Sequence, residues 1–220
     1  MARTKGKESL VPAQKGGRQR NKVVHVFTEG KVTEPEYIHI VRERSPVSGI
    51  EVRIANASDR GSRREPLKLV DAAVRLMRDE KREAKRSGLP KKLWPMVWCL
   101  FDRDQHEGVE SAFKQAREAG VRVAFSHPCF EVWRLLHHKP VVGTFGGVCD
   151  LAADRLPFAK QVTDVKQVLP EQIPKQSFGQ AKKWALKMNA EHEDHVPYSQ
   201  RDPYTDVFTF VEEGLGIIAY

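Results

Sequence analysis

Four short apolar segments of the chain have the character of β-strands. Residues 22–28, 96–101 and 121–125 are rich in β-branched or aromatic residues and are apolar on successive positions, which is typical of strands buried on both faces. Residues 51–55 alternate between apolar and polar positions and predict a further, shorter strand. A polar loop bearing glycine and arginine follows, over residues 56–65.

Helical patterns separate these strands. Thr33 and Glu36 have the spacing of a capping box and predict a helix of about ten residues that ends near Ser45. A longer helix is predicted over 66–87 and another over 108–119, closed by a glycine. The apolar face of the long helix comprises Leu67, Val70, Ala73, Val74 and Met77. Because strands and helices alternate, we predict an α/β fold with a mainly parallel sheet flanked by helices.

The last eighty residues show weaker patterns. Residues 154–170 predict a helix and a turn, 176–191 have helical spacing, and a terminal helix is expected from Asp206 onward. We therefore divide the chain into an N-terminal arm (1–21), a core (22–140) and a C-terminal helical extension packed on that core (141–220). The extension could form a dimer or partner contact, or serve ordinary core packing.

Composition limits the class of protein. With 220 residues and 40% hydrophobic content, the chain can bury one sizeable core. It has no apolar stretch of about 20 residues and no signal-peptide pattern, so we expect a cytoplasmic protein without a membrane span. Cys99, Cys129 and Cys149 form no CxxC pair and are expected to be reduced packing residues.

Positive charge is concentrated in two segments. Residues 1–22 carry seven basic residues and one acidic residue, a net +6 of the formal +8. We expect a disordered basic arm that either binds nucleic acid through its phosphates or acts only as a solubilising tail. Residues 60–92 carry twelve basic and five acidic residues, which fits either a phosphate-facing surface or a solvated helix.

Three carboxylates are expected at the carboxyl ends of the buried strands. Glu29 follows the first strand, and Asp102 and Asp104 follow the strand over 96–101. Ligand sites of parallel sheets collect at this edge. Side chains at i and i+2 of an extended segment point the same way, so Asp102 and Asp104 could share one face with Glu29 nearby. Such an oxygen cage suits Mg²⁺, and Gly30 would let the backbone turn and a substrate approach.

Other polar residues have two interpretations each. Glu36 suits helix capping better than metal binding, whereas Glu34 could serve either the helix dipole or the site. Glu131 lies in an apolar helical stretch, so it is either a site residue or half of a structural ion pair. His127 could pack in a loop or touch substrate, and His137 with its neighbour suits a helix C-terminus better than a metal site.

Three motifs, taken in order, carry a family resemblance. The stretches FTEGKVTEPEYI, FDRDQH and FSHPCFEVWRLLHH together resemble the RloB family, which is similar to proteins with a Toprim catalytic fold. The resemblance covers roughly residues 22–140 and extends less sharply to the end. It implies that Glu29, Asp102 and Asp104 are catalytic and bind Mg²⁺ (or Mn²⁺), with Glu34 and Glu131 as candidates for a second metal position. His127 departs from the asparagine that is frequent in the family, which weakens any role assigned to it.

The resemblance also implies an activity and partners. RloB-like proteins resemble components of bacterial anti-phage systems, often encoded near an ATPase, so we expect a metal-dependent nuclease acting on RNA, tRNA or DNA, gated by an ATPase partner and able to form a homodimer. The candidate nucleic-acid contacts are Lys31, Arg60, Arg63, Arg64, Arg103 and His127.

Two other classes of function stay open on the sequence alone. A strand-end DxD pair also occurs in nucleotidyl and phosphoryl transferases. A non-catalytic subunit could use the basic arm and residues 60–92 to hold nucleic acid.

Overall fold

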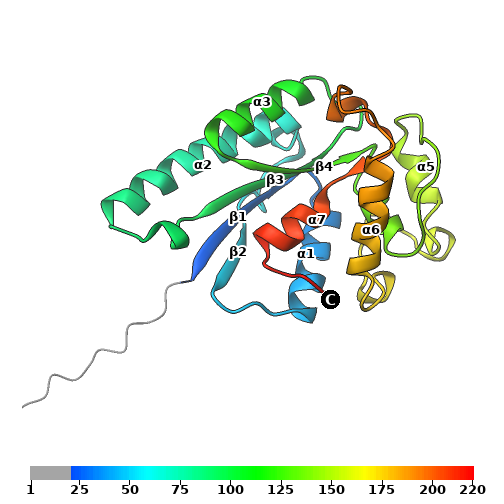
Figure 1. The fold of residues 1–220 in the computed structure, drawn as a ribbon, viewed down its shortest axis with the longest axis horizontal. Helices are drawn as coiled ribbons and strands as arrows, with labels where there is room; N and C mark the ends of the chain where they lie inside the picture. Colours follow the sequence, from blue (N-terminus) through cyan, green and yellow to red (C-terminus); the bar gives the residue numbers. More distant parts are fainter. Residues whose placement is uncertain (1–20) are drawn as a thin grey trace, which may run out of the picture.

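The computed structural model describes residues 21–220, so the expected basic arm lies outside the described residues. A five-stranded sheet with the order β2-β1-β3-β4-β5 forms the centre of the molecule (Figure 1). Its first four strands are parallel, and β5 pairs antiparallel with β4. The strands are β1 (Lys22–Thr28), β2 (Ile50–Ile54), β3 (Met96–Asp102), β4 (Arg122–His127) and β5 (Tyr204–Thr205). The predicted α/β fold with a mainly parallel sheet is confirmed.

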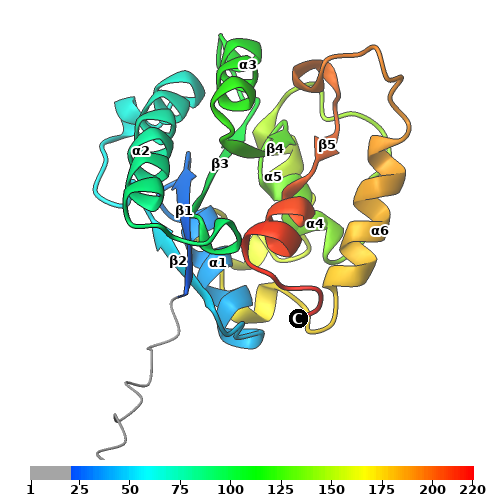
Figure 2. The same ribbon diagram turned by 60° about the vertical axis from the view of Figure 1, so that its left-hand side comes forward.

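Helices cover both faces of the sheet (Figures 1 and 2). The long helix α2 (Pro66–Arg86) and α3 (Val109–Ala119) pack on one face, as their shared apolar cluster with the strands shows. The other face carries α1 (Thr33–Arg44), α4 (Glu131–Leu136), α5 (Cys149–Asp154), α6 (Phe178–Asn189) and α7 (Val207–Thr209). None of the helices within residues 21–220 has the length and apolar character needed to cross a bilayer.

Successive residues of a strand belong alternately to two apolar clusters, one on the α1 side of the sheet and one on the α2 side. Val26 faces the α1 side while Phe27 faces the α2 side, and Trp98 and Cys99 divide in the same way. This alternation follows from the two-residue period of a strand and explains why both faces of β1 and β3 are apolar. The sheet is therefore the middle layer of three, and the carboxyl ends of its strands lie outside the two apolar clusters.

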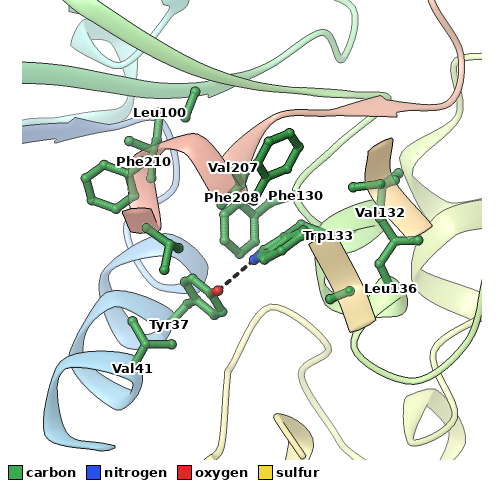
Figure 3. Packing of buried hydrophobic residues seen from close by; sticks show 14 of the residues in the cluster. Tyr37, Val41, Leu100, Phe130, Val132, Trp133, Leu136, Val207, Phe208 and Phe210 are labelled. Carbon is green, nitrogen blue, oxygen red and sulfur yellow. Dashed lines mark hydrogen bonds between the residues drawn. The ribbon is translucent and has the colours of Figure 1, made fainter. Parts of the chain in front are cut away.

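The cluster on the α1 side is centred on Trp133 of α4 (Figure 3). Its indole Nε1 donates a hydrogen bond to the hydroxyl of Tyr37 at 2.7 Å, which connects α4 to α1. Phe208 of α7 packs against the same indole with a ring-centroid distance of 6.4 Å. Residues from the start and the end of the chain thus share one core, and this fixes α1 and α4 relative to each other.

The predicted capping box at the start of α1 is wrong. Val32 is the N-cap, and no side chain caps the helix. The hydroxyl of Thr33 instead donates to the carbonyl of Lys166 at 2.8 Å, and Glu36 accepts from the backbone N–H of Val168 at 2.6 Å. Both side chains therefore anchor the segment around residues 166–168 against α1, because that segment offers backbone partners that the sequence pattern could not reveal.

Two smaller expectations also need correction. Leu67 was assigned to the apolar face of α2, but it is exposed, and Leu69 occupies the buried position. The C-terminal part was expected to be only a helical extension, yet β5 adds a fifth strand to the sheet. With two residues, β5 is too short to leave a strand pattern in the sequence.

Candidate metal-binding site at the sheet edge

Six carboxylates line one cavity at the carboxyl edge of the sheet. The volume of this cavity is about 430 Å³. Three of the carboxylates, Glu29, Asp102 and Asp104, come from the ends of β1 and β3 and the residues that follow. Three more come from the first turns of helices α1, α4 and α5. The six are Glu29, Glu34, Asp102, Asp104, Glu131 and Asp150. The structure thus brings together every acidic residue that the sequence proposed for this site.

Glu29 is held through both of its carboxylate oxygens. Oε2 accepts the backbone N–H of Asp102 at 2.8 Å, and Oε1 lies 2.6 Å from Nε2 of His106. The backbone N–H of Glu29 donates to the carbonyl of Leu100 at 2.9 Å, which continues the pairing of β1 with β3 beyond the strand end. The position of Glu29 is therefore set by the sheet itself.

Asp102 and Asp104 occupy different positions in the cavity. Asp102 accepts the backbone N–H of Phe130 at 3.0 Å, just before α4 begins. The chain then leaves the strand conformation, and Asp104 has a φ of 31°, in the left-handed region. Its backbone N–H donates to the carbonyl of Pro128 at 3.0 Å. The expectation that the two side chains share one face of an extended segment does not hold, although both reach the cavity.

Glu34 belongs to the cavity as well as to the first turn of α1. Its Oε1 accepts the backbone N–H of Gly30 at 2.8 Å. A Cβ atom at position 30 would lie 2.0 Å from the other oxygen of Glu34, so any other residue there would force the Glu34 carboxylate to move. Burial, opposed by hydrogen bonds and reinforced by Glu29 and Glu131, raises the pKa of Glu34 to about 7.

The carboxylates repel one another more than nearby cations compensate. Burial raises the pKa of Asp102 well above its ordinary value, and the charges of Glu29, Glu34 and Glu131 raise it further. Glu131 is 9% exposed and lies 3.7 Å from Nη1 of Arg134, so it lines the cavity and also forms a structural ion pair. Charging the carboxylates of this cavity is therefore unfavourable, and a bound cation would make it less so.

One subset of side chains has the spacing of metal ligands. Among residues 21–220, ligand atoms of Glu29, Asp104 and His106 all lie within 4.8 Å of one another. Asp102 is not in this group, although the sequence paired it with Asp104. His106 was not among the predicted site residues, but it lies in the motif FDRDQH, four residues after Asp102, and that spacing was the available signal.

The candidate nucleic-acid contacts differ in exposure. Lys31, Arg60 and Arg63 are exposed, as a contact surface requires. Arg64 is 3% exposed, and its Nη1 donates to the carbonyl oxygens of Thr28 at 2.8 Å and of Gly30 at 2.9 Å. Its assignment to a nucleic-acid surface is therefore wrong, because its guanidinium group is used to fix the backbone on either side of Glu29.

Arg103 and His127 also have internal roles. Nη1 of Arg103 donates to the carbonyl of His106 at 2.7 Å and closes the turn between them. Its Nε donates to the carbonyl of Ser199 at 3.2 Å. His127 is 7% exposed, and burial lowers its pKa, so it is a neutral interior side chain near the cavity and not a surface contact.

Sequence reasoning missed several other residues that line the cavity, among them Cys129, Cys149, Asp150 and Lys166. The cysteines are free, as expected, and Cys129 is a buried packing residue. Cys149 is partly exposed, and its thiol lies 3.6 Å from Oδ1 of Asp104. Lys166 is brought in by the anchored segment next to α1, far along the chain from the acidic residues. No local pattern could have assigned it.

Comparisons with known proteins agree with the motifs. The family model described as RloB-like protein matches residues 24–213. Neither the curated proteins nor the solved structures gave a match. The matched range includes all six cavity carboxylates, most of β1, strands β2 to β5 and helices α1 to α7. The chain therefore belongs to the RloB-like family.

Proposed function

We propose that this protein is a metal-dependent nuclease that cleaves phosphodiester bonds of RNA, tRNA or DNA. The observation that supports the proposal best is the convergence of Glu29, Asp102 and Asp104, with three further carboxylates, on one cavity at the carboxyl edge of a mainly parallel sheet. Backbone hydrogen bonds hold Glu29, Glu34 and Asp102 in place, so the acidic groups are oriented before any ligand arrives.

The donor set suits a divalent cation. Carboxylate oxygens are the preferred ligands of Mg²⁺ and Mn²⁺. Burial, and then the neighbouring carboxylates, raise the pKa of Asp102, and a bound cation would favour its charged form. Glu29 and Asp104 would hold the ion, with Asp102, Glu34 and Glu131 near it. When bound, such an ion supplies charge neutralisation at a phosphate and lowers the pKa of a coordinated water.

The protein's own groups have separate tasks in this scheme. Oε1 of Glu29 contacts Nε2 of His106 at 2.6 Å, so the imidazole helps to hold the Glu29 carboxylate at the cavity. Lys166 lines the cavity, and Lys31 is exposed next to Gly30, which also lines it. Both lysines can therefore attract a phosphate. Arg64 keeps the backbone of Thr28 and Gly30 in place, which positions Glu29 between them.

Cleavage by purified protein tests the proposal. We expect wild type to cut a single-stranded RNA, a tRNA or a plasmid in the presence of Mg²⁺ or Mn²⁺, and EDTA to stop the reaction. Glu29→Gln and Asp104→Asn should each lower the rate more than about 100-fold, because each removes a charged metal ligand. Glu83→Gln on the exposed surface of α2 is the matched control and should cut like wild type.

Cellular role and regulation form part of the proposal. We propose that the nuclease acts in the cytoplasm as an effector of bacterial anti-phage defence by abortive infection. In this proposal an ATPase partner controls the nuclease, and two copies of the chain form a homodimer. A free nuclease would harm its host, which supports gating. Equal cutting with and without an ATPase partner would contradict the gating part alone.

A non-catalytic nucleic-acid-binding subunit is the second candidate. The exposed Arg60 and Arg63, followed by the basic surface of α2, support it. Binding of RNA or DNA without cleavage by wild type, even with Mn²⁺ and the ATPase present, would favour this function. In that case Arg60→Gln with Arg63→Gln should weaken binding, whereas Glu29→Gln should not. A DxD transferase is a third candidate, and no contact in the cavity favours it.

A further inference from the structure

His106 adds a nitrogen donor to an otherwise oxygen-lined cavity. Its Nε2 lies 2.6 Å from Oε1 of Glu29, and the two share a group of ligand atoms with Asp104 within 4.8 Å. We infer that His106 is the third protein ligand of the metal site and that it makes the site selective for Mn²⁺ over Mg²⁺. The inference rests on the proposed function in one respect, because both place the metal ion in the same cavity.

The turn that carries His106 is built to hold it in this place. The backbone N–H of His106 donates to the carbonyl of Arg103 at 3.2 Å, and its own carbonyl accepts from Nη1 of Arg103 at 2.7 Å. Arg103 is tied in turn to the carbonyl of Ser199. The side chain of His106 is 26% exposed, so it is not needed to fill the core. The hydrogen bonds of the turn hold the backbone of His106 in place, and metal ligands are generally oriented by such supporting contacts.

The spacing between Glu29 and His106 fits two ligands of one ion. Adjacent ligands of a six-coordinate ion with bonds of about 2.1 Å lie about 3 Å apart. The two atoms are now 2.6 Å apart in a direct hydrogen bond. For both to bind a cation, the proton between them must be released to solvent and the two atoms must separate slightly. Asp104 reaches the same position from the turn before His106, where its backbone is fixed by Pro128.

The chemical nature of the donors decides which ion is favoured. Mg²⁺ binds imidazole poorly and is usually held by one or two carboxylates and several waters. Imidazole is a good ligand for first-row transition metals, and a site with carboxylates beside it suits Mn²⁺ among them. Glu29, Asp104 and His106 give two oxygens and one nitrogen, which resembles that mixed set. Metal choice in this protein is thus assigned to one side chain.

Metal binding to the purified full chain tests the inference without reference to cleavage. By calorimetry, we expect wild type to bind Mn²⁺ at least about 10-fold more tightly than Mg²⁺. His106→Gln should weaken Mn²⁺ binding by about 10- to 100-fold and change Mg²⁺ binding less than about threefold. His39→Gln, on an exposed histidine of α1, is the matched control and should bind both ions like wild type.

A spectroscopic measurement detects the nitrogen ligand in the wild-type protein directly. Electron spin-echo modulation of the Mn²⁺-loaded wild type should show coupling to one imidazole nitrogen, and His106→Gln should lose that coupling. Mn²⁺ bound without nitrogen coupling, or equal loss of Mg²⁺ and Mn²⁺ affinity in His106→Gln, would overturn the inference while the nuclease proposal stands. Selective Mn²⁺ binding through His106 in a protein that cuts no nucleic acid would uphold the inference and refute the nuclease proposal.

Discussion

Two groups of polar side chains lie within this fold, and they differ in how their needs are met. Between α1, α4 and the last residue, Trp133 donates to Tyr37, which also contacts the hydroxyl of Tyr220. Tyr220 contacts Nε2 of His137 at 3.1 Å, and Nδ1 of His137 lies 2.7 Å from the hydroxyl of Ser177. Burial lowers the pKa of His137 to about 3, so the whole chain of contacts is uncharged.

The cavity at the sheet edge is the opposite case. Its carboxylates also accept backbone hydrogen bonds, but their charges face one another without an equal number of cations. A neutral, fully partnered network stabilises the fold. A set of oriented like charges costs stability and persists where a ligand repays that cost. The difference separates the structural polar groups of this protein from its functional ones, and substitutions in the two regions should have effects of opposite sign.

The largest effect is expected in the neutral network. Trp133 is fully buried at the centre of its core, so Trp133→Ala should lower the free energy of unfolding by about 3–5 kcal/mol. Urea unfolding followed by circular dichroism measures this loss. Trp133→Phe keeps most of the volume and loses only the donor to Tyr37, so it should cost about 1 kcal/mol. Equal effects of the two variants would show that packing around the indole is not the main contribution.

Arg64 should behave as a structural residue although it is charged. Arg64→Gln removes the buried charged donor that the carbonyl oxygens of Thr28 and Gly30 share, and leaves them only the neutral donors Nδ2 of Asn56 and Oγ1 of Thr28. We therefore expect a loss of about 1–3 kcal/mol in unfolding free energy. Arg63→Gln is the matched control, since Arg63 is exposed one residue away and should change stability by less than about 0.5 kcal/mol. A loss of stability in Arg64→Gln no larger than that in Arg63→Gln would contradict the structural role of Arg64.

Removing a charge from the cavity should have the reverse sign. Asp102→Asn keeps an oxygen that can accept from Phe130 and removes one of the facing carboxylates. Without metal, we expect the variant to be more stable than wild type by about 0.5–2 kcal/mol. Added Mn²⁺ should then raise the melting temperature of wild type more than that of the variant. A less stable Asp102→Asn protein would place Asp102 with the structural groups.

Asp206 provides the smallest test, because it is a buried carboxyl outside the cavity. It accepts from the backbone N–H of Phe125 at 2.6 Å, and burial raises its pKa to about 7. A folded pKa above the unfolded value means that the folded state holds its proton longer, so stability falls as pH rises from about 4 to about 7.

Comparison of wild type with Asp206→Asn isolates this contribution. The unfolding free energies of the two proteins should diverge by about 1 kcal/mol between pH 6 and pH 7, with wild type losing more. The asparagine retains an acceptor for Phe125, so the hydrogen bond itself is kept. Parallel pH profiles of the two proteins would show that Asp206 ionises equally in the folded and unfolded states.

Local patterns in the sequence predicted the sheet and the acidic edge because these depend on short-range periodicity. The apolar runs of β1 and β3 place Glu29 and Asp102 at strand ends without further information. Long-range contacts were not predictable in this way. Thr33 binds a carbonyl 133 positions later, and Arg64 is buried by carbonyl groups of a separate strand end. Charge and spacing alone assigned both residues to local or surface roles.

Gly30 and Glu34 impose a constraint on how this family can vary. Any side chain at position 30 would force the carboxylate at position 34 to move, and a shorter residue at 34 would release the backbone N–H of Gly30. A change at either position alone therefore breaks the hydrogen bond that holds the loop next to Glu29. Among natural RloB-like sequences, we expect the two positions to be substituted together or not at all.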